Sequence, residues 1–261
     1  MQNKKRKMIT MQMIIFELRN VTGNPYVHIF GVGLPVVLAE LITMVAVSEV
    51  NDPSLAGMIA TSVYLGMGTL IPMAMILMGY AVCYAQELDK GIPERMQLFG
   101  IRGSSMLCSR AISEAIFITV SFGIFFAVGY GVSDLEQPAA SGVVSYFLSI
   151  LVLSVILLAL AHGVACICRS FGRTYCVSMM LYFAFMIFSG MMGVEYADLP
   201  KWAQAVARML PVTYINRDFY QVWSGEEYNY MPMIQSYLFL GAVSGILLFL
   251  VWKRSPRAEI S

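Results

Sequence analysis

Six long apolar stretches limit what this chain can fold into more than any other feature of its sequence. They cover residues 28–47, 58–82, 107–130, 143–166, 174–192 and 233–252. Each holds about the twenty apolar residues that a helix needs to cross the hydrocarbon core of a bilayer. Of the 261 residues, 58% are hydrophobic and 13% are charged, whereas soluble proteins carry about 25% charged residues. The sequence therefore predicts an all-α integral membrane protein with six transmembrane helices.

The connections between these stretches are short, so we expect a single domain without a separate soluble catalytic part. Residues 1–27 are predicted to form a cytoplasmic interfacial helix, residues 28–252 the six spans, and residues 253–261 a cytoplasmic tail. The phosphate-binding pattern Gly-x-x-x-x-Gly-Lys-Ser/Thr does not occur, so ATP is not expected to bind through such a loop. Two histidines are too few for a histidine-rich metal site. We expect no cofactor or metal on this chain.

Basic residues are distributed unevenly about the six stretches. If the N-terminus is cytoplasmic, fourteen of the seventeen Lys and Arg residues fall on that side, and only Lys201, Arg208 and Arg217 fall on the other. An excess of Lys and Arg on the cytoplasmic side is typical of multi-pass membrane proteins. We therefore expect a plasma-membrane protein of bacterial type with both termini in the cytoplasm. The net charge of +1 gives no indication of a nucleic-acid partner.

An amphipathic helix is predicted before the first span. Met11, Ile14, Ile15 and Leu18 recur at helical spacing behind the basic residues 4–7. This pattern favours a helix that lies in the inner surface of the membrane, with its lysines near anionic head groups. The alternative is a frayed cytoplasmic tail.

The connection between the second and third stretches is the most charged segment of the chain. Pro93 suits the first turn of a short helix, and Glu94 favours the positive end of that helix. Such a helix presents Met96, Leu98 and Phe99 among charged residues. Composition leaves two interpretations open, a docking surface for another protein and a solvated connector.

The longest outer segment, residues 193–230, also contains a predicted helix. Pro200 and Pro211 bound it, and Trp202 lies among apolar residues on one of its sides. The helix either re-enters the bilayer in part or lies on the outer membrane surface.

Charged residues within or at the edge of the spans are candidates for function, because ionised side chains are costly there. Glu40 lies in the first span, where it faces a wet cavity, a partner or a hydroxyl, or extends toward the outer interface. Glu114 follows Arg110 by one helical turn, so we expect a structural ion pair between them. Two interpretations are open for the twenty methionines, including Met73 and Met192: an adaptable surface for apolar substrates, or lipid-facing filler.

The order of these features resembles the membrane subunit of ABC type-2 exporters over nearly the whole chain. The segment Glu87-x-x-x-Gly91-x-x-Glu94-Arg95 is similar to the family's Glu-x-x-x-Gly-Thr-x-Glu-Arg motif, with isoleucine in place of the threonine. A second signature of the family is similar to three later pieces of this chain. These are Ser189-Gly190, then Leu-Pro-x-Trp ending at Trp202, and then Leu-Pro-x-Thr.

The resemblance implies a partner and a role for the charged connection. ATP and Mg²⁺ would bind to a separate ABC ATPase subunit, and this chain would work with a second copy or a similar subunit. The coupling helix that contacts the ATPase would contain Glu87, Gly91, Glu94, Arg95, Met96, Leu98 and Phe99. The substrate, a drug, antibiotic, peptide or lipid, would pass between the two copies, with Glu40, Met73 and Met192 along its path and Trp202 in an outer lid.

Two other classes of function are weighed against this expectation. An ion-driven secondary transporter would use Glu40 as its proton site, although the charged connection would then have no evident role. An intramembrane enzyme would use Ser189 and His162, but these residues fall near opposite ends of their predicted spans.

Overall fold

The computed structural model describes residues 10–48, 50–101, 103–192 and 196–254. Within these residues the chain is helical, with no β-strand, and six helical stretches are long and apolar enough to cross a membrane. The predicted all-α architecture with six spans is therefore confirmed. The basic residues 4–7, Arg102 and most of the predicted tail lie outside the described residues.

The spans agree with the predicted stretches, and several extend beyond them. Their bounds are Ile29–Val47, Pro53–Asp89, Gly103–Val132, Ala140–Cys168, Phe171–Phe188 and Met231–Lys253. The first consists of the π-helix η1 (Ile29–Gly33) and α3 (Leu34–Val47), and the second of α4 (Pro53–Gly68), α5 (Leu70–Met73), η2 (Ala74–Tyr80) and α6 (Ala81–Asp89). The others are α8 (Gly103–Val132), α9 (Ala140–Cys168), α10 (Phe171–Phe188) and α14 (Met231–Arg254).

The second span forms the centre of the bundle. In its most apolar window 94% of the residues are buried, against 33% or less in each of the other spans. Apolar helices that keep most of their surface open are expected to contact lipid or another membrane protein. Met73 is fully buried in this central span. The side chain is enclosed within one copy, so a place for Met73 on a substrate path between copies stays a prediction.

Proline interrupts regular α-helix in the first two spans. The π-helix η1 ends just before Pro35, and the π-helix η2 begins just after Pro72. Proline lacks the N–H that an α-helical turn needs, so the preceding carbonyls must find other geometry. The first span therefore begins with a wider turn, and the second span contains one just past its middle.

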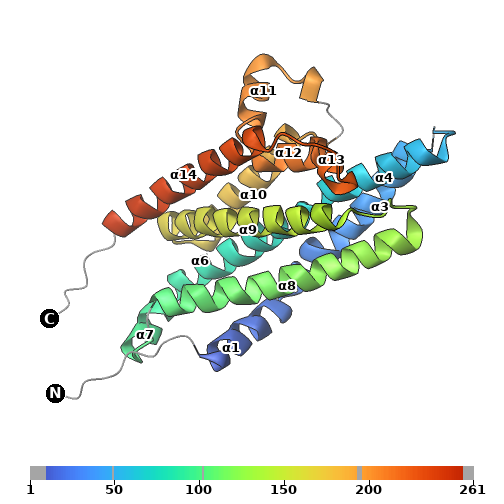
Figure 1. Ribbon diagram of the computed structural model, residues 1–261. Helices are drawn as coiled ribbons and strands as arrows, with labels where there is room; N and C mark the ends of the chain where they lie inside the picture. The colour runs from blue at the N-terminus through green and yellow to red at the C-terminus, as the bar shows by residue number, and fades with distance from the viewer. Residues whose placement is uncertain (1–9, 49, 102, 193–195, 255–261) are drawn as a thin grey trace.

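Short helices gather at the two ends of the bundle (Figure 1). At one end lie α1 (Met11–Thr22), α2 (Pro25–His28) and α7 (Ile92–Leu98), and the C-terminal part of α14 points the same way. We call this the α7 end. At the opposite end, the α11 end, lie η3 (Tyr196–Asp198), α11 (Lys201–Ala207), α12 (Pro211–Arg217) and α13 (Phe219–Ser224).

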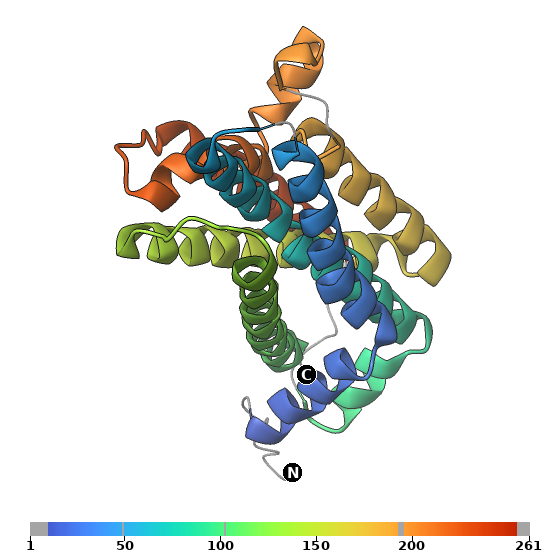
Figure 2. The same ribbon diagram turned by 90° about the vertical axis from the view of Figure 1, so that its right-hand side faces the viewer.

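The amphipathic helix α1 packs beside α8, at the α7 end (Figure 2). Its buried residues are Glu17 and Val21, and the Ser113 hydroxyl of α8 donates a 3.0 Å hydrogen bond to the Ile14 carbonyl. Met11 and Phe16 are exposed. Within the described residues this segment is helical over Met11–Thr22, and its exposed apolar residues leave it suited to a membrane surface, which stays a prediction.

Candidate functional site

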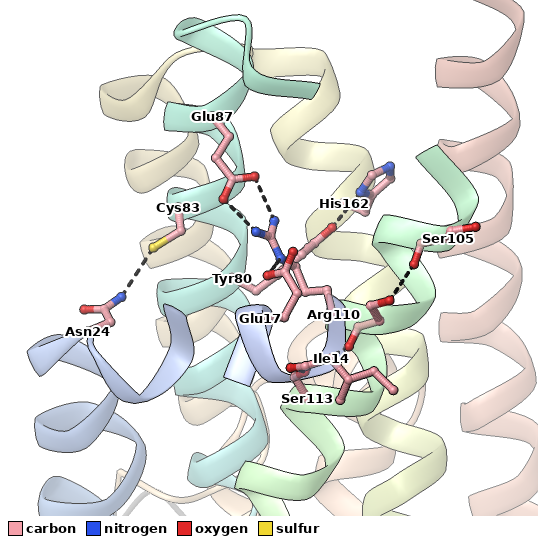
Figure 3. Close-up of polar contacts among 11 residues, drawn as sticks. Ile14, Glu17, Asn24, Tyr80, Cys83, Glu87, Ser105, Arg110, Ser113 and His162 are labelled. Atoms are coloured by element: carbon pink, nitrogen blue, oxygen red, sulfur yellow. Dashed lines mark hydrogen bonds and ion pairs between the residues drawn. The ribbon is translucent and has the colours of Figure 1, made fainter. Parts of the chain in front are cut away.

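A buried ionic cluster lies at the α7 end, centred on Arg110 in the second turn of α8 (Figure 3). The guanidinium Nη1 and Nη2 donate to the two carboxylate oxygens of Glu87 in α6, at 3.1 and 2.6 Å. Its Nε donates to Glu17 of α1 at 2.9 Å. Arg110 is only 7% exposed. One side chain thus links the N-terminal helix, the second span and the third span.

Aromatic rings enclose the guanidinium of Arg110. The rings of Tyr80 and Tyr84 lie 5.5 and 5.7 Å from it, centroid to Cζ, which is within the range of cation–π attraction. The Tyr80 hydroxyl and His162 Nδ1 of α9 are 2.7 Å apart, and the ring of His162 stacks on Tyr84 at 4.7 Å. The cluster therefore contacts the fourth span as well.

The predicted ion pair between Arg110 and Glu114 is wrong. Arg110 uses its donors on Glu17 and Glu87, and Glu114 Oε2 is buried with no hydrogen-bond partner among the described residues. The spacing of one turn made a pair plausible, but the carboxylates from α1 and α6 already accept the hydrogen bonds of the guanidinium. Glu17 was missed as a member of the cluster; the signal was an acid on the same face as Ile14 and Val21 of an amphipathic helix.

The chain turns sharply on both sides of α7, and this places the helix directly below the cluster. Gly91 has a φ of +64°, a left-handed conformation that glycine adopts at little cost, and Pro93 opens the helix. Gly100, at φ +86°, ends it. Glu87 lies on α6, before α7, and Arg110 lies on α8, after it. Their ion pair therefore holds α6 and α8 together on either side of α7.

The free surface of α7 is apolar at its C-terminal end. Leu98 is 79% exposed and Phe99 is 75% exposed, while Glu94 and Arg95 are exposed beside them. Met96 is half-buried. Two neighbouring large apolar side chains at a helix end, surrounded by charges, are typical of a protein-binding surface.

Glu40 occupies a separate polar site toward the α11 end. Its carboxylate accepts hydrogen bonds from the Tyr64 hydroxyl and, at 2.9 Å, from the Ser133 hydroxyl. Of the alternatives left open by the sequence, the structure therefore favours a carboxylate held by hydroxyls. These bonds join the first, second and third spans near the start of the loop after α8.

A cavity of about 460 Å³ opens at the α11 end between α3, α4 and the outer helices. One wall is apolar and includes Met58, Met67 and Met191, and the other contains Asn216, Arg217, Asp218, Tyr220 and Gln221. Its size falls in the usual range for small-molecule pockets, about 300–1,000 Å³.

The polar wall of this cavity contains an ion pair and a phenol. The Arg217 guanidinium donates to both oxygens of Asp218 at 2.6 and 2.7 Å, and these bonds raise the pKa of Arg217. Partial burial and the Glu136 carboxylate raise the pKa of Tyr220 to about 12. The wall therefore presents the Arg217 guanidinium, held by the Asp218 side chain, and a neutral phenol.

The remaining candidates lie at the same end. Met192 is exposed, as is Trp202 of α11, whose ring contacts Phe188 with centroids 6.0 Å apart. The Ser189 hydroxyl donates to its own helix, at Met186, and the Asn216 amide donates to the Ser189 carbonyl. His162 belongs to the cluster at the opposite end. The structure thus does not bring the Ser189 and His162 of the hypothetical enzyme together.

Comparison with protein families identifies the family of this chain. Residues 10–222 match the family model of the ABC-2 type transporter. That range includes the five spans up to α10, all residues of the ionic cluster, α7 and the outer cavity. A comparison with curated proteins found no match.

Proposed function

Because this chain belongs to the ABC-2 type transporter family, we propose that it is the permease subunit of an exporter driven by a separate ABC ATPase. ATP and Mg²⁺ bind to the ATPase subunit. The substrate is a hydrophobic or amphipathic molecule such as a drug, antibiotic, peptide or lipid. Two permease subunits, identical or similar, stand side by side in the plasma membrane.

The observation that carries this proposal is the exposed apolar end of α7 beneath a buried ionic cluster. Leu98 and Phe99 offer the ATPase a contact surface, and Glu87 and Arg110 hold together the helices on either side of it. A displacement of α7 therefore moves α6 and α8 as one body. Closure of two ATPase subunits on ATP rocks such bodies against each other, as in other rigid-body transitions.

The proposed orientation follows from the basic residues. The α7 end faces the cytoplasm, where the ATPase binds, and the α11 end faces outward. Glu17 and Arg110 attach α1 to the moving unit, so the N-terminal helix lies along the inner membrane surface and shifts with it.

The outer cavity supports an amphipathic substrate. Its methionines form a deformable apolar wall that adapts to ligands of different shape, and Arg217 with Asp218 faces a polar head. In the proposed cycle the substrate leaves through this cavity at the α11 end, with Trp202 in an outer lid.

Charges placed on the α7 surface are expected to abolish binding of the ATPase. Leu98→Asp and Phe99→Asp together remove the apolar contact, yet both positions are exposed, so the free energy of unfolding should change by no more than about 0.5 kcal/mol. The measurement is co-purification of the tagged permease with its co-expressed ABC ATPase, followed by a thermal melt.

The matched control is Phe171→Asp, an exposed aromatic residue at the start of α10. It should leave the complex intact. If the doubly substituted chain still binds the ATPase as the unmodified chain does, α7 is not the contact and this part of the proposal fails.

The competing hypothesis of an ion-driven transporter rests on Glu40. In the proposed exporter, Glu40→Gln keeps a hydrogen-bonding side chain beside Tyr64 and Ser133, so ATP-driven transport into vesicles should fall no more than about tenfold, the equivalent of about 1.4 kcal/mol. A proton gradient without ATP should drive no transport. Uptake that needs only the gradient, and that Glu40→Gln abolishes, would favour the secondary transporter.

A further inference from the structure

Glu114 is a buried acid that the proposed coupling does not use. It lies on α8 one turn after Arg110 and is 5% exposed. Its Oε2 has no hydrogen-bond partner in the part of the chain that the structure describes. A buried carboxylate normally has a cation or several donors beside it, because its charge has lost the stabilisation of water.

The charges around Glu114 are already unbalanced toward the negative. The groups that face this region are Glu17 from α1, Tyr80, Cys83 and Glu87 from the second span, and Arg110 from α8 itself. Arg110 is the cation among them, and it bonds two carboxylates. A third ionised carboxylate would leave the buried cluster with an excess of two negative charges. A bound proton removes one of them.

A small cavity beside Glu114 gives such a proton a place and a route. It measures about 20 Å³ and is lined by Asn20, Asn24, Tyr80, Cys83 and Arg110, among others, together with Glu114. A polar cavity of that size is large enough for one water molecule. The cavity lies among α8, the second span and the connection from α1 to α2, so it is at the α7 end itself.

We propose that Glu114 is a proton-binding site inside the coupling cluster, with its carboxylic acid hydrogen-bonded to a single water in this cavity. In the neutral form Glu114 leaves Arg110 to Glu17 and Glu87. When the proton is lost, the Glu114 carboxylate competes for Arg110 from one turn away and weakens the bonds to α1 and α6. Coupling then depends on cytoplasmic pH, a consequence that rests on the proposed function.

The first test is spectroscopic and needs no ATPase. Infrared spectra of the purified chain at pH 7 are expected to show the carbonyl stretch of a protonated carboxylic acid, and E114Q should remove it. E227Q, at an exposed glutamate of the outer loop, should leave the band unchanged. The absence of such a band from the unmodified chain, or a band that persists in E114Q, overturns the proton site.

A stability measurement separates this proposal from a hidden ion pair. Glutamine has the shape and polarity of the protonated acid, so E114Q should melt at the same temperature as the unmodified chain or above it. If Glu114 were ionised and paired with Arg110, E114Q would melt lower, and the proposal would be wrong. Neither result depends on whether the ATPase binds α7.

The second test concerns coupling in the assembled transporter. ATP-driven transport by the unmodified complex should fall as the pH on the ATPase side is raised, whereas E114Q should change only as the ATPase itself does. Equal pH profiles for the two complexes would contradict a role of Glu114 in coupling. The infrared spectra would still decide whether Glu114 binds a proton.

Discussion

Arg110→Ala is expected to lower the free energy of unfolding by about 3–5 kcal/mol, the usual cost of leaving buried charges without their partner. Glu17 and Glu87 would both lose their cation, and α1 would lose its main polar bond to α8. The effect is measured by heating the protein in detergent and monitoring the loss of the monodisperse species. Arg110→Lys should cause an intermediate loss, because a single ammonium cannot reproduce the two-pronged contact with Glu87.

A fully neutral cluster distinguishes stability from coupling. When Glu17→Gln and Glu87→Gln accompany Arg110→Gln, no charge remains uncompensated, and much of the lost stability should return. Transport driven by ATP should not return, since the link between α6 and α8 is gone. Recovery of both would show that the cluster only stabilises the fold. The matched control is Arg217→Ala, which breaks a half-exposed pair and should cost no more than about 1 kcal/mol.

Gly142→Ala is expected to destabilise the protein by about 1–3 kcal/mol through overpacking between α9 and α13. A Cβ at Gly142 would lie 2.7 Å from the carbonyl oxygens of Val222 and Trp223 and 2.8 Å from the Trp223 Cα. All three are backbone atoms, so no side-chain rotation relieves the contact and α13 must move. Because α13 carries Tyr220 and Gln221 of the outer cavity, transport should also decline.

The control for this substitution is Gly123→Ala in α8. Nothing lies within 4 Å of a Cβ at Gly123, and alanine is the better helix former by about 0.5–1 kcal/mol, so this variant should be as stable as the unmodified chain or more so. Equal melting temperatures for the Gly142 and Gly123 variants would contradict the close contact between α9 and α13.

The spans were predictable from the sequence because hydropathy alone specifies a membrane helix of about twenty residues. The extension of the second span to Asp89 was not, since its last residues are polar and packing on other helices holds them in place. The sequence also did not indicate which apolar side chains are buried within the bundle. Met73 and Met192 look alike in the sequence, yet Met73 is fully enclosed while Met192 is exposed.

The candidate site was predictable only in part, and the reason is the distance along the chain between its members. The motif from Glu87 to Arg95 located α7 correctly, because its turn residues and charges are local signals. The partners of Arg110 are 93 and 23 residues away. The i, i+4 pairing rule for helices predicted Glu114 as the partner instead. Glu17 becomes apparent only from the packing of α1 on α8.

The central claim is that an ATPase on the cytoplasmic side binds the exposed surface of α7. A single cysteine at Leu98, in a chain whose five native cysteines have been replaced, tests it by labelling with a membrane-impermeant maleimide. We expect the cysteine to react in inside-out vesicles stripped of the ATPase, to be protected by added ATPase, and to stay unlabelled in intact cells. Labelling in intact cells, or equal labelling of inside-out vesicles with and without the ATPase, would contradict the account.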